Sequence, residues 1–173
     1  MLRRCLLICT MLMTFPAQAL EEVYLAPERF VAETFGGSAP KPRLLWLTRD
    51  VATVAGRILG HAPSHLRQRY WADGNKSVWV LDEIGKEEPI TAGFVIENGH
   101  ITQARVLVFR ESRGAEIHYP AFLKQYLGAT LSVEKQLDRN IDGISGATLS
   151  VHAMGRMARL ALYFDAVKQM EDK

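Results

Sequence analysis

The sequence predicts an α+β fold, an antiparallel sheet meander flanked by helices, and two observations predict it. Between residues 65 and 110, four β-rich runs follow one another without an intervening helix, and Asn98-Gly99 between two of them is a strong hairpin signal. From about residue 150 to 170, apolar residues recur at helical spacing without a proline. The sequence therefore predicts a long C-terminal helix beside the sheet.

The elements expected before the meander are short. Pro27 suits the first turn of a helix, where its missing N–H removes no hydrogen bond, and Gly36-Gly37 suits the end of that helix. The expected elements are, in order, a helix over residues 27–35, a brief strand over 44–47 and a helix over 50–60.

The middle of the chain supplies the sheet. The expected strands cover residues 65–74, 76–85, 90–99 and 100–110, and their short connections favour antiparallel pairing. A polar stretch follows, then a short helix that begins after Pro120 and ends at Gly128. In the long C-terminal helix, Gly155 costs about 1 kcal/mol relative to alanine unless packing explains it.

Residues 1–19 are predicted to be a cleaved signal peptide. Arg3 and Arg4 precede a short apolar run, and Ala17-Gln18-Ala19 supplies the small residues of a cleavage site. The run is shorter than the roughly 20 residues that span a bilayer. We therefore expect export to the periplasm, with membrane association left open, and a single domain over residues 20–173.

The export segment also explains the charge and the cysteines. Arg3 and Arg4 account for the formal net charge of +2, so the expected mature chain is neutral and gives no argument for a nucleic-acid partner. Both cysteines, Cys5 and Cys9, lie in the same segment. The mature chain would thus have no thiol for a disulfide, an iron–sulfur cluster or attached haem, and redox work would require another cofactor.

The six letters GATLSV occur twice, at residues 128–133 and 146–151. The first copy continues from the expected short helix, and Thr130 has Lys124 six positions before it and Leu127 three before it. Nothing in these neighbours indicates chemistry. We interpret the first copy as structural.

The second copy lies where a loop enters the long helix. Thr148 has Asp142 six positions before it and Ser145 three before it. Unpaired N–H groups and the positive end of the helix dipole make such a helix start a site for a phosphate. The alternative is that Ser145, Thr148 and Ser150 only cap the helix.

Residues 142–148, DGISGAT, resemble the flavinylation motif of FMN-binding domains, such as those in the C subunit of the sodium-pumping NADH:quinone oxidoreductase and the G subunit of the Rnf complex. The resemblance covers roughly residues 88–168 and includes a polar turn, Glu111-Ser112-Arg113-Gly114. Arg113, Ala115 and Glu116 depart from the usual pattern of that turn, and the N-terminal 65 residues resemble no family. The resemblance implies FMN on Thr148 through a phosphoester bond, and cofactor-binding residues Thr148, Asp142, Gly143, Ser145, Gly146, Ala147, Leu149, Ser150, Glu111 and Gly114.

By this resemblance, an FAD-dependent flavin transferase attaches the FMN. The protein would be an electron carrier for membrane or periplasmic redox partners rather than a free-standing catalyst. Two alternatives stay open. One is a non-redox periplasmic binding module in which residues 142–150 are only a capped loop, and the other is a domain that binds FMN without a covalent bond.

Other signals are weaker. The run GISGA has alanine at the last position of a nucleophile elbow and lacks a preceding buried strand. His61 and His65 have a metal-like spacing, but Pro63 between them disfavours a regular helix, so we expect no metal. Arg110 and Arg113 would either stabilise reduced flavin or remain solvated charges at a strand end.

Overall fold

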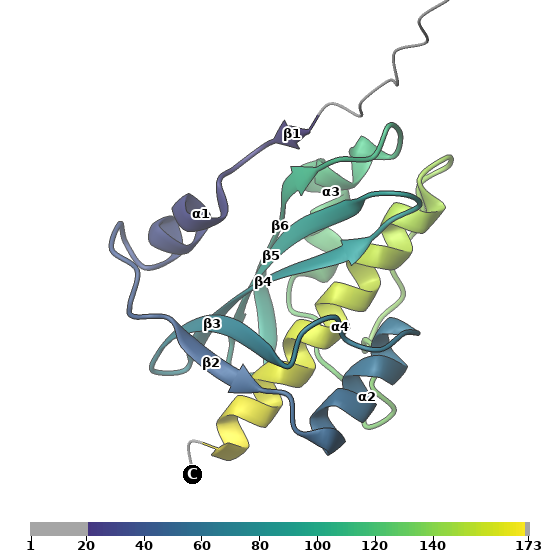
Figure 1. Ribbon diagram of the computed structural model, residues 1–173. Coiled ribbons are helices and arrows are strands. Elements are labelled where there is room, and N and C mark those ends of the chain that lie inside the picture. Colours follow the sequence, from purple (N-terminus) through teal and green to yellow (C-terminus); the bar gives the residue numbers. More distant parts are fainter. Residues whose placement is uncertain (1–20, 172–173) are drawn as a thin grey trace, which may run out of the picture.

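The computed structural model describes residues 21–171 and has a six-stranded antiparallel sheet with helices on both faces (Figure 1). The strand order is β1-β6-β5-β4-β3-β2, so the four central strands form the expected meander. The predicted α+β class is confirmed. The strands are β1 (Glu22–Val23), β2 (Arg43–Trp46), β3 (Arg67–Asp73), β4 (Lys76–Ile84), β5 (Pro89–Glu97) and β6 (His100–Phe109).

The helices are α1 (Pro27–Thr34), α2 (Arg49–Leu59), α3 (Pro120–Leu123) and α4 (Thr148–Glu171), with the 3₁₀ helices η1 (Ala115–His118) and η2 (Lys124–Tyr126). The main core lies between one face of the sheet and α2, α3 and α4. Long helix α4 runs across this face and buries residues such as Met154, Met157 and Phe164. None of the described helices is both long enough and apolar enough to span a membrane.

Helix α1 covers the opposite face of the sheet. Its Phe30 and Val31 are buried against Val78, Val95 and Leu107 in a second, smaller core. Gly93 of β5 leaves the space that the Phe30 ring fills, because a Cβ at that position would overlap the ring. A glycine in the middle of a buried strand therefore marks close packing of a helix.

Three details differ from the sequence-based expectations. The helix expected over residues 121–128 is split into α3 and η2, and after η2 the N–H of Gly128 donates to the carbonyl of Ile101 (2.7 Å), which turns the chain toward β6. Strand β1 has only two residues, which is too short to leave a periodic pattern. Helix α4 begins at Thr148, so the second GATLSV copy lies partly within it.

The residues predicted as a signal peptide, 1–19, lie outside the described part of the chain. Gly155 has no close neighbour that would require a glycine. It lies inside α4, and no heavy atom is within 4 Å of a Cβ built there. Packing therefore does not explain this glycine.

We expect Gly93→Ala to lower the free energy of unfolding by about 1–3 kcal/mol, because the added methyl group overpacks the contact with Phe30. Gly155→Ala is the matched control and should raise the same quantity by about 0.5–1 kcal/mol, since helix interiors favour alanine over glycine. Urea unfolding of both variants measures the difference. Equal effects would contradict the assigned packing of α1.

Candidate functional site

Three segments that are distant in sequence meet at one end of the molecule, at the upper right of Figure 1. They are the β4–β5 connection, the turn after β6, and the loop that enters α4. Between them lies a pocket of about 520 Å³, which is within the usual range of roughly 300–1,000 Å³ for small-molecule sites. The lining residues are Lys86, Glu111, Ser112, Arg113, Gly146, Ala147, Thr148, Leu149 and Ser150.

Apolar side chains anchor the loop before α4, residues 141–147, to the main core. Ile141 and Ile144 pack against the main core, and the N–H of Asp142 donates to Oε1 of Gln125 (2.7 Å). A turn then brings the N–H of Ala147 to the carbonyl of Ile144 (3.0 Å). Gly146 has φ +83° in this turn, a conformation that favours glycine.

Helix α4 starts without a side-chain cap. The carbonyl of Ala147 accepts the first helical bond from the N–H of Val151 (2.9 Å), so alanine, which has no side-chain oxygen, occupies the N-cap position. Thr148 is the first helical residue, it is exposed, and no described residue bonds its hydroxyl. No side-chain hydrogen bond from Ser145, Thr148 or Ser150 to this helix start is present among the described residues. Free N–H groups and the positive end of the dipole remain beside the Thr148 hydroxyl.

The turn after β6 packs directly on this helix start. Gly114 is buried with φ +89°, and a Cβ there would lie 2.8 Å from Oγ of Ser150 and 3.2 Å from Cβ of Ala147. A side chain at Gly114 would separate the turn from α4. Gly114 thus shapes the site through close approach and does not itself line the pocket.

Glu111 connects the turn to the β4–β5 connection. Its Oε1 accepts hydrogen bonds from the N–H groups of Lys86, Glu87 (2.7 Å) and Glu88 (3.0 Å). Gly85 permits this approach, since a Cβ there would lie 2.8 Å from the same oxygen. Desolvation of Glu111 works to raise its pKa, but these three bonds outweigh that effect and hold the pKa below its ordinary value.

Two cations line the pocket beside Thr148. Arg113 comes from the turn after β6, and Lys86, which the sequence did not single out, comes from the β4–β5 connection. Arg110 lies elsewhere: it pairs with Glu21 (2.9 Å) and donates to the Pro89 carbonyl (3.1 Å). Lys86 had no detectable signal in the sequence, because only the sheet register brings this hairpin to α4.

The other predicted site residues are near the pocket without lining it. Asp142, Gly143 and Ser145 are exposed in the loop that precedes the helix. Their exposure leaves the segment accessible to another protein.

The first GATLSV copy has a different environment. Ala129 is buried, the N–H of Thr130 donates to Oδ1 of Asp138 (3.2 Å), and the Thr130 carbonyl accepts from the N–H of Asp138 (3.1 Å). Leu131 then bridges to Leu137 across a turn. Thr130 therefore belongs to a hydrogen-bonded turn and does not begin a helix.

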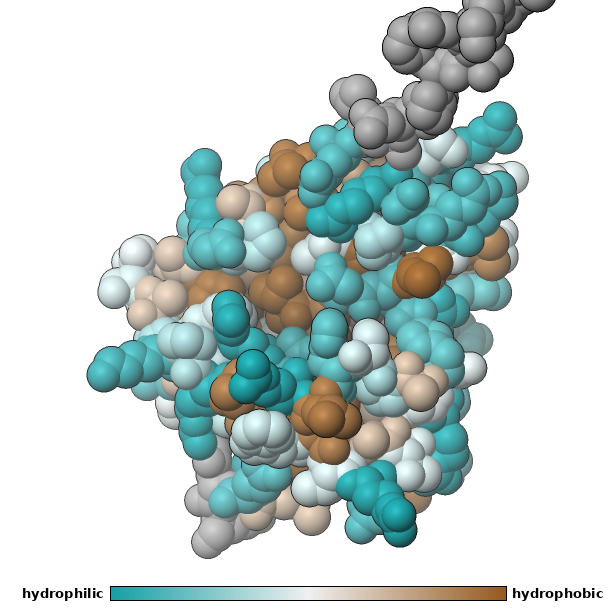
Figure 2. All heavy atoms as spheres, viewed as in Figure 1, coloured by the Kyte–Doolittle hydropathy of each residue, from teal (hydrophilic) through white to brown (hydrophobic). Residues whose placement is uncertain are grey.

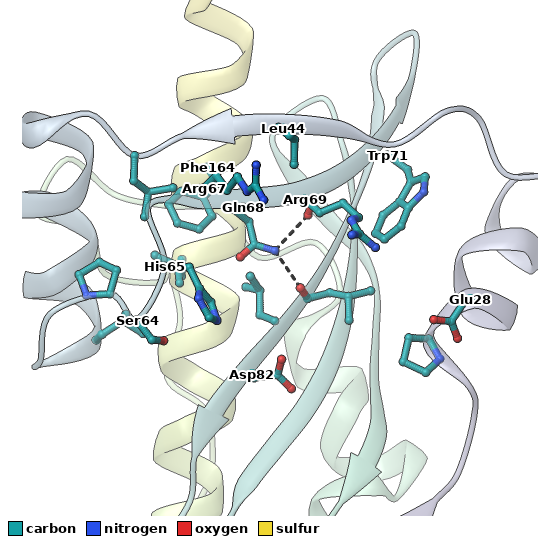
Figure 3. A pocket seen from close by; sticks show the side chains of 17 residues that line it. Glu28, Leu44, Ser64, His65, Arg67, Gln68, Arg69, Trp71, Asp82 and Phe164 are labelled. Carbon is teal, nitrogen blue, oxygen red and sulfur yellow. Dashed lines mark hydrogen bonds between the residues drawn. The ribbon is translucent and has the colours of Figure 1, made fainter.

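A second pocket of about 490 Å³ lies where β3 leaves β4 (Figure 3). The amide of Gln68 bridges the gap by donating to the Val80 carbonyl (3.0 Å), and His65, Arg69 and Trp71 surround it. Figure 2 shows hydrophobic residues gathered in a hollow beside α1 on this side of the molecule. None of the predicted site residues lines this pocket.

Glu111→Gln should lower the free energy of unfolding at pH 7 by about 1 kcal/mol, because a neutral amide oxygen accepts the three N–H bonds more weakly and solvent screens part of the loss. The folded-state pKa of Glu111 is depressed, so its stabilisation is present above the ordinary carboxyl pKa and is lost as the pH falls through the folded value. Denaturant unfolding from pH 7 to pH 3 should show the two proteins converging. A constant difference would contradict this role.

Residues 85–163 match the family model described as the FMN-binding domain. No curated protein shows a significant match to the chain. The matched segment begins at Gly85 and contains every residue that lines the pocket, including Glu111 and Thr148, as well as Gly114. Residues 85–163, a little under half of the chain, are thus similar to the FMN-binding domain family.

Proposed function

We propose that the protein is an electron-transfer flavoprotein that carries FMN on Oγ of Thr148 through a phosphoester bond. One observation carries this proposal: within an FMN-binding domain, an exposed threonine hydroxyl without a hydrogen-bond partner among the described residues begins α4 at the rim of a pocket. The residues fit the group, because the uncapped helix start accepts a phosphate and the pocket beside it has the volume of a ligand site.

The attachment uses FAD as the donor and a flavin transferase as the enzyme. The Thr148 oxygen attacks the FMN-side phosphorus, an O–P bond forms, the pyrophosphate P–O bond breaks, and AMP leaves. The hydroxyl proton passes to a base or metal-bound group of the transferase, because a neutral alcohol is a weak nucleophile and no side chain in the described part of this chain bonds the hydroxyl. The exposed loop residues Asp142, Gly143 and Ser145 are accessible for recognition by that enzyme.

A covalent bond suits the weakness of the local electrostatics. The helix dipole stabilises a phosphodiester at a surface helix start by about 0.3–1 kcal/mol, which is too little for retention by a dilute protein. Arg113 adds positive charge at the pocket, and this charge favours the electron-rich form of a bound ring, whereas the ammonium of Lys86 is paired with Glu87 (2.7 Å). The FMN supplies the redox chemistry when it is bound.

The pocket's titratable groups favour a carrier over a free-standing catalyst. They are Lys86, Glu111 and Arg113, and Glu111 already accepts three backbone hydrogen bonds. No paired acid and base lines the described pocket, as substrate chemistry by proton transfer would require. An accessible flavin that exchanges electrons with another redox protein needs no such pair.

The two GATLSV copies provide a matched test of the attachment site. After co-expression with a flavin transferase, the wild-type protein should gain the mass of one FMN minus one water, Thr130→Val should gain the same, and Thr148→Val should gain nothing. Intact-mass spectrometry measures all three. Full yellow colour that survives denaturing gel filtration in Thr148→Val would overturn the site, whereas colour that is lost on denaturation in the wild type would indicate non-covalent FMN.

We also propose that the protein is exported and meets its redox partner in the periplasm or at a membrane. The support is the charged, apolar and small-residue pattern of residues 1–19. N-terminal sequencing of the protein recovered from periplasmic extract should begin at Leu20. A mature protein that begins at Met1 would contradict the proposal.

A further inference from the structure

The exposed face of α4 continues from the candidate flavin site toward α2. Thr148, His152, Gly155 and Arg159 recur at helical spacing and share this face, which extends about 16 Å from the first residue to the last. Two adjoining hollows of about 420 and 390 Å³ border it, and both are lined by Arg57, Ile58 and Arg159. The exposed surface that continues from Thr148 is therefore concave.

Cations dominate the lining of these hollows. The lining includes Arg57, Lys135, Arg156 and Arg159, and Glu134 is its single carboxylate. We call these four cations, with His152, the arginine face. Such a concentration differs from the chain as a whole, in which acidic and basic residues are nearly balanced.

Two of the four cations, Arg57 and Arg159, have no opposite charge beside them among the described residues, whereas Lys135 lies next to Glu134. Arg156 pairs with buried Glu83 (2.9 Å), but Arg159 donates only to neutral oxygens, those of Gln136 (3.0 Å), Gly155 (3.3 Å) and Ile58 (3.4 Å). Among the described residues, no carboxylate pairs with Arg57. Burial and the neighbouring Arg156 lower the pKa of Arg159, as expected for a cation without a counter-charge.

Two residues on this face violate the usual rules of local stability. Gly155 lies inside a helix with open space around it, where alanine would be more stable. Lys135 has φ +61°, a left-handed conformation that disfavours a residue with a side chain, in a turn closed by the bond from its N–H to the Ser132 carbonyl (3.1 Å), and its ammonium lies 5.8 Å from the Tyr163 ring centre. A violation without a packing reason, such as Gly155, occurs preferentially at functional sites.

We propose that the arginine face is the docking surface for an acidic electron-transfer protein, which reaches the flavin at the Thr148 end of the same helix. This inference rests on the proposed function. A concentration of positive charge beside a redox group steers an acidic partner and raises its association rate. A second copy of this chain does not fit, because a twofold interface would bring the same cations together.

The test uses the flavinylated protein, reduced and mixed by stopped flow with ferricyanide or with hexaammineruthenium(III). Each reduced flavin gives two electrons, one to each of two oxidant ions, and releases its protons to the solvent. Arg57→Glu/Lys135→Glu changes the arginine face, and Arg69→Glu/Arg105→Glu makes the same charge change at exposed positions on the other face of the sheet.

At low salt, the docking variant should react about tenfold more slowly with ferricyanide and faster with the cationic oxidant, while the control changes by less than about twofold. Added salt should remove the difference. A fluorescein-labelled peptide of ten glutamates should bind flavin-free wild type and the control, but not the docking variant. This second measurement does not depend on the flavin.

The outcomes separate the two proposals. Equal rates and equal peptide binding for the docking and control variants would overturn the docking surface and leave the carrier function intact. Displacement of the peptide by inorganic phosphate, beyond the effect of sodium chloride at the same ionic strength, would replace the docking surface with a small-anion site. A protein that gains no flavin from the transferase would overturn the carrier function and, with it, the proposed partner.

Discussion

The carboxylate of Glu111 holds together the end of the molecule that carries Thr148. One oxygen accepts three backbone N–H groups of the β4–β5 connection, and the same turn brings Gly114 against the first residues of α4. Three segments are thereby fixed around one pocket by one ionised side chain and one glycine. Because the carboxylate is occupied in this way, it acts as a structural anchor, and the chemistry of the pocket is left to Thr148 and the two neighbouring cations.

The start of α4 exposes Thr148 while a defined turn fixes the backbone before it. Its N-cap is an alanine, so the first-turn N–H groups have no side-chain oxygen from the N-cap residue, and the left-handed Gly146 fixes the preceding turn. An ordinary capped helix would be somewhat more stable, by about 1 kcal/mol. The site thus forgoes a local stabilisation, as does Gly155 two turns further along the same helix.

The segments outside the matched domain have a defined place in the fold. Helix α1 covers the face of the sheet opposite α4 by inserting Phe30 over Gly93, and α2 packs beside α4 and supplies Arg57 to the arginine face. The segments outside the matched residues also form most of the pocket where β3 and β4 separate. The N-terminal part therefore completes both faces of a sheet whose strands β5 and β6, with most of α4, lie in the matched residues 85–163.

The sequence by itself determined the class of the fold and the meander, because these depend on local patterns: β-rich runs between turns and helical periodicity. From a short motif and its neighbours alone, it also predicted Thr148 rather than Thr130 as the attachment site. Tertiary structure decided the rest of the site. Lys86 lines the same pocket as Thr148 only because of the register of β4 and β5, and Glu111 acts through hydrogen bonds to a different hairpin. The grouping of Arg57, Lys135 and Arg159 likewise depends on how α2 and a loop pack on α4, a contact between segments that no local pattern specifies.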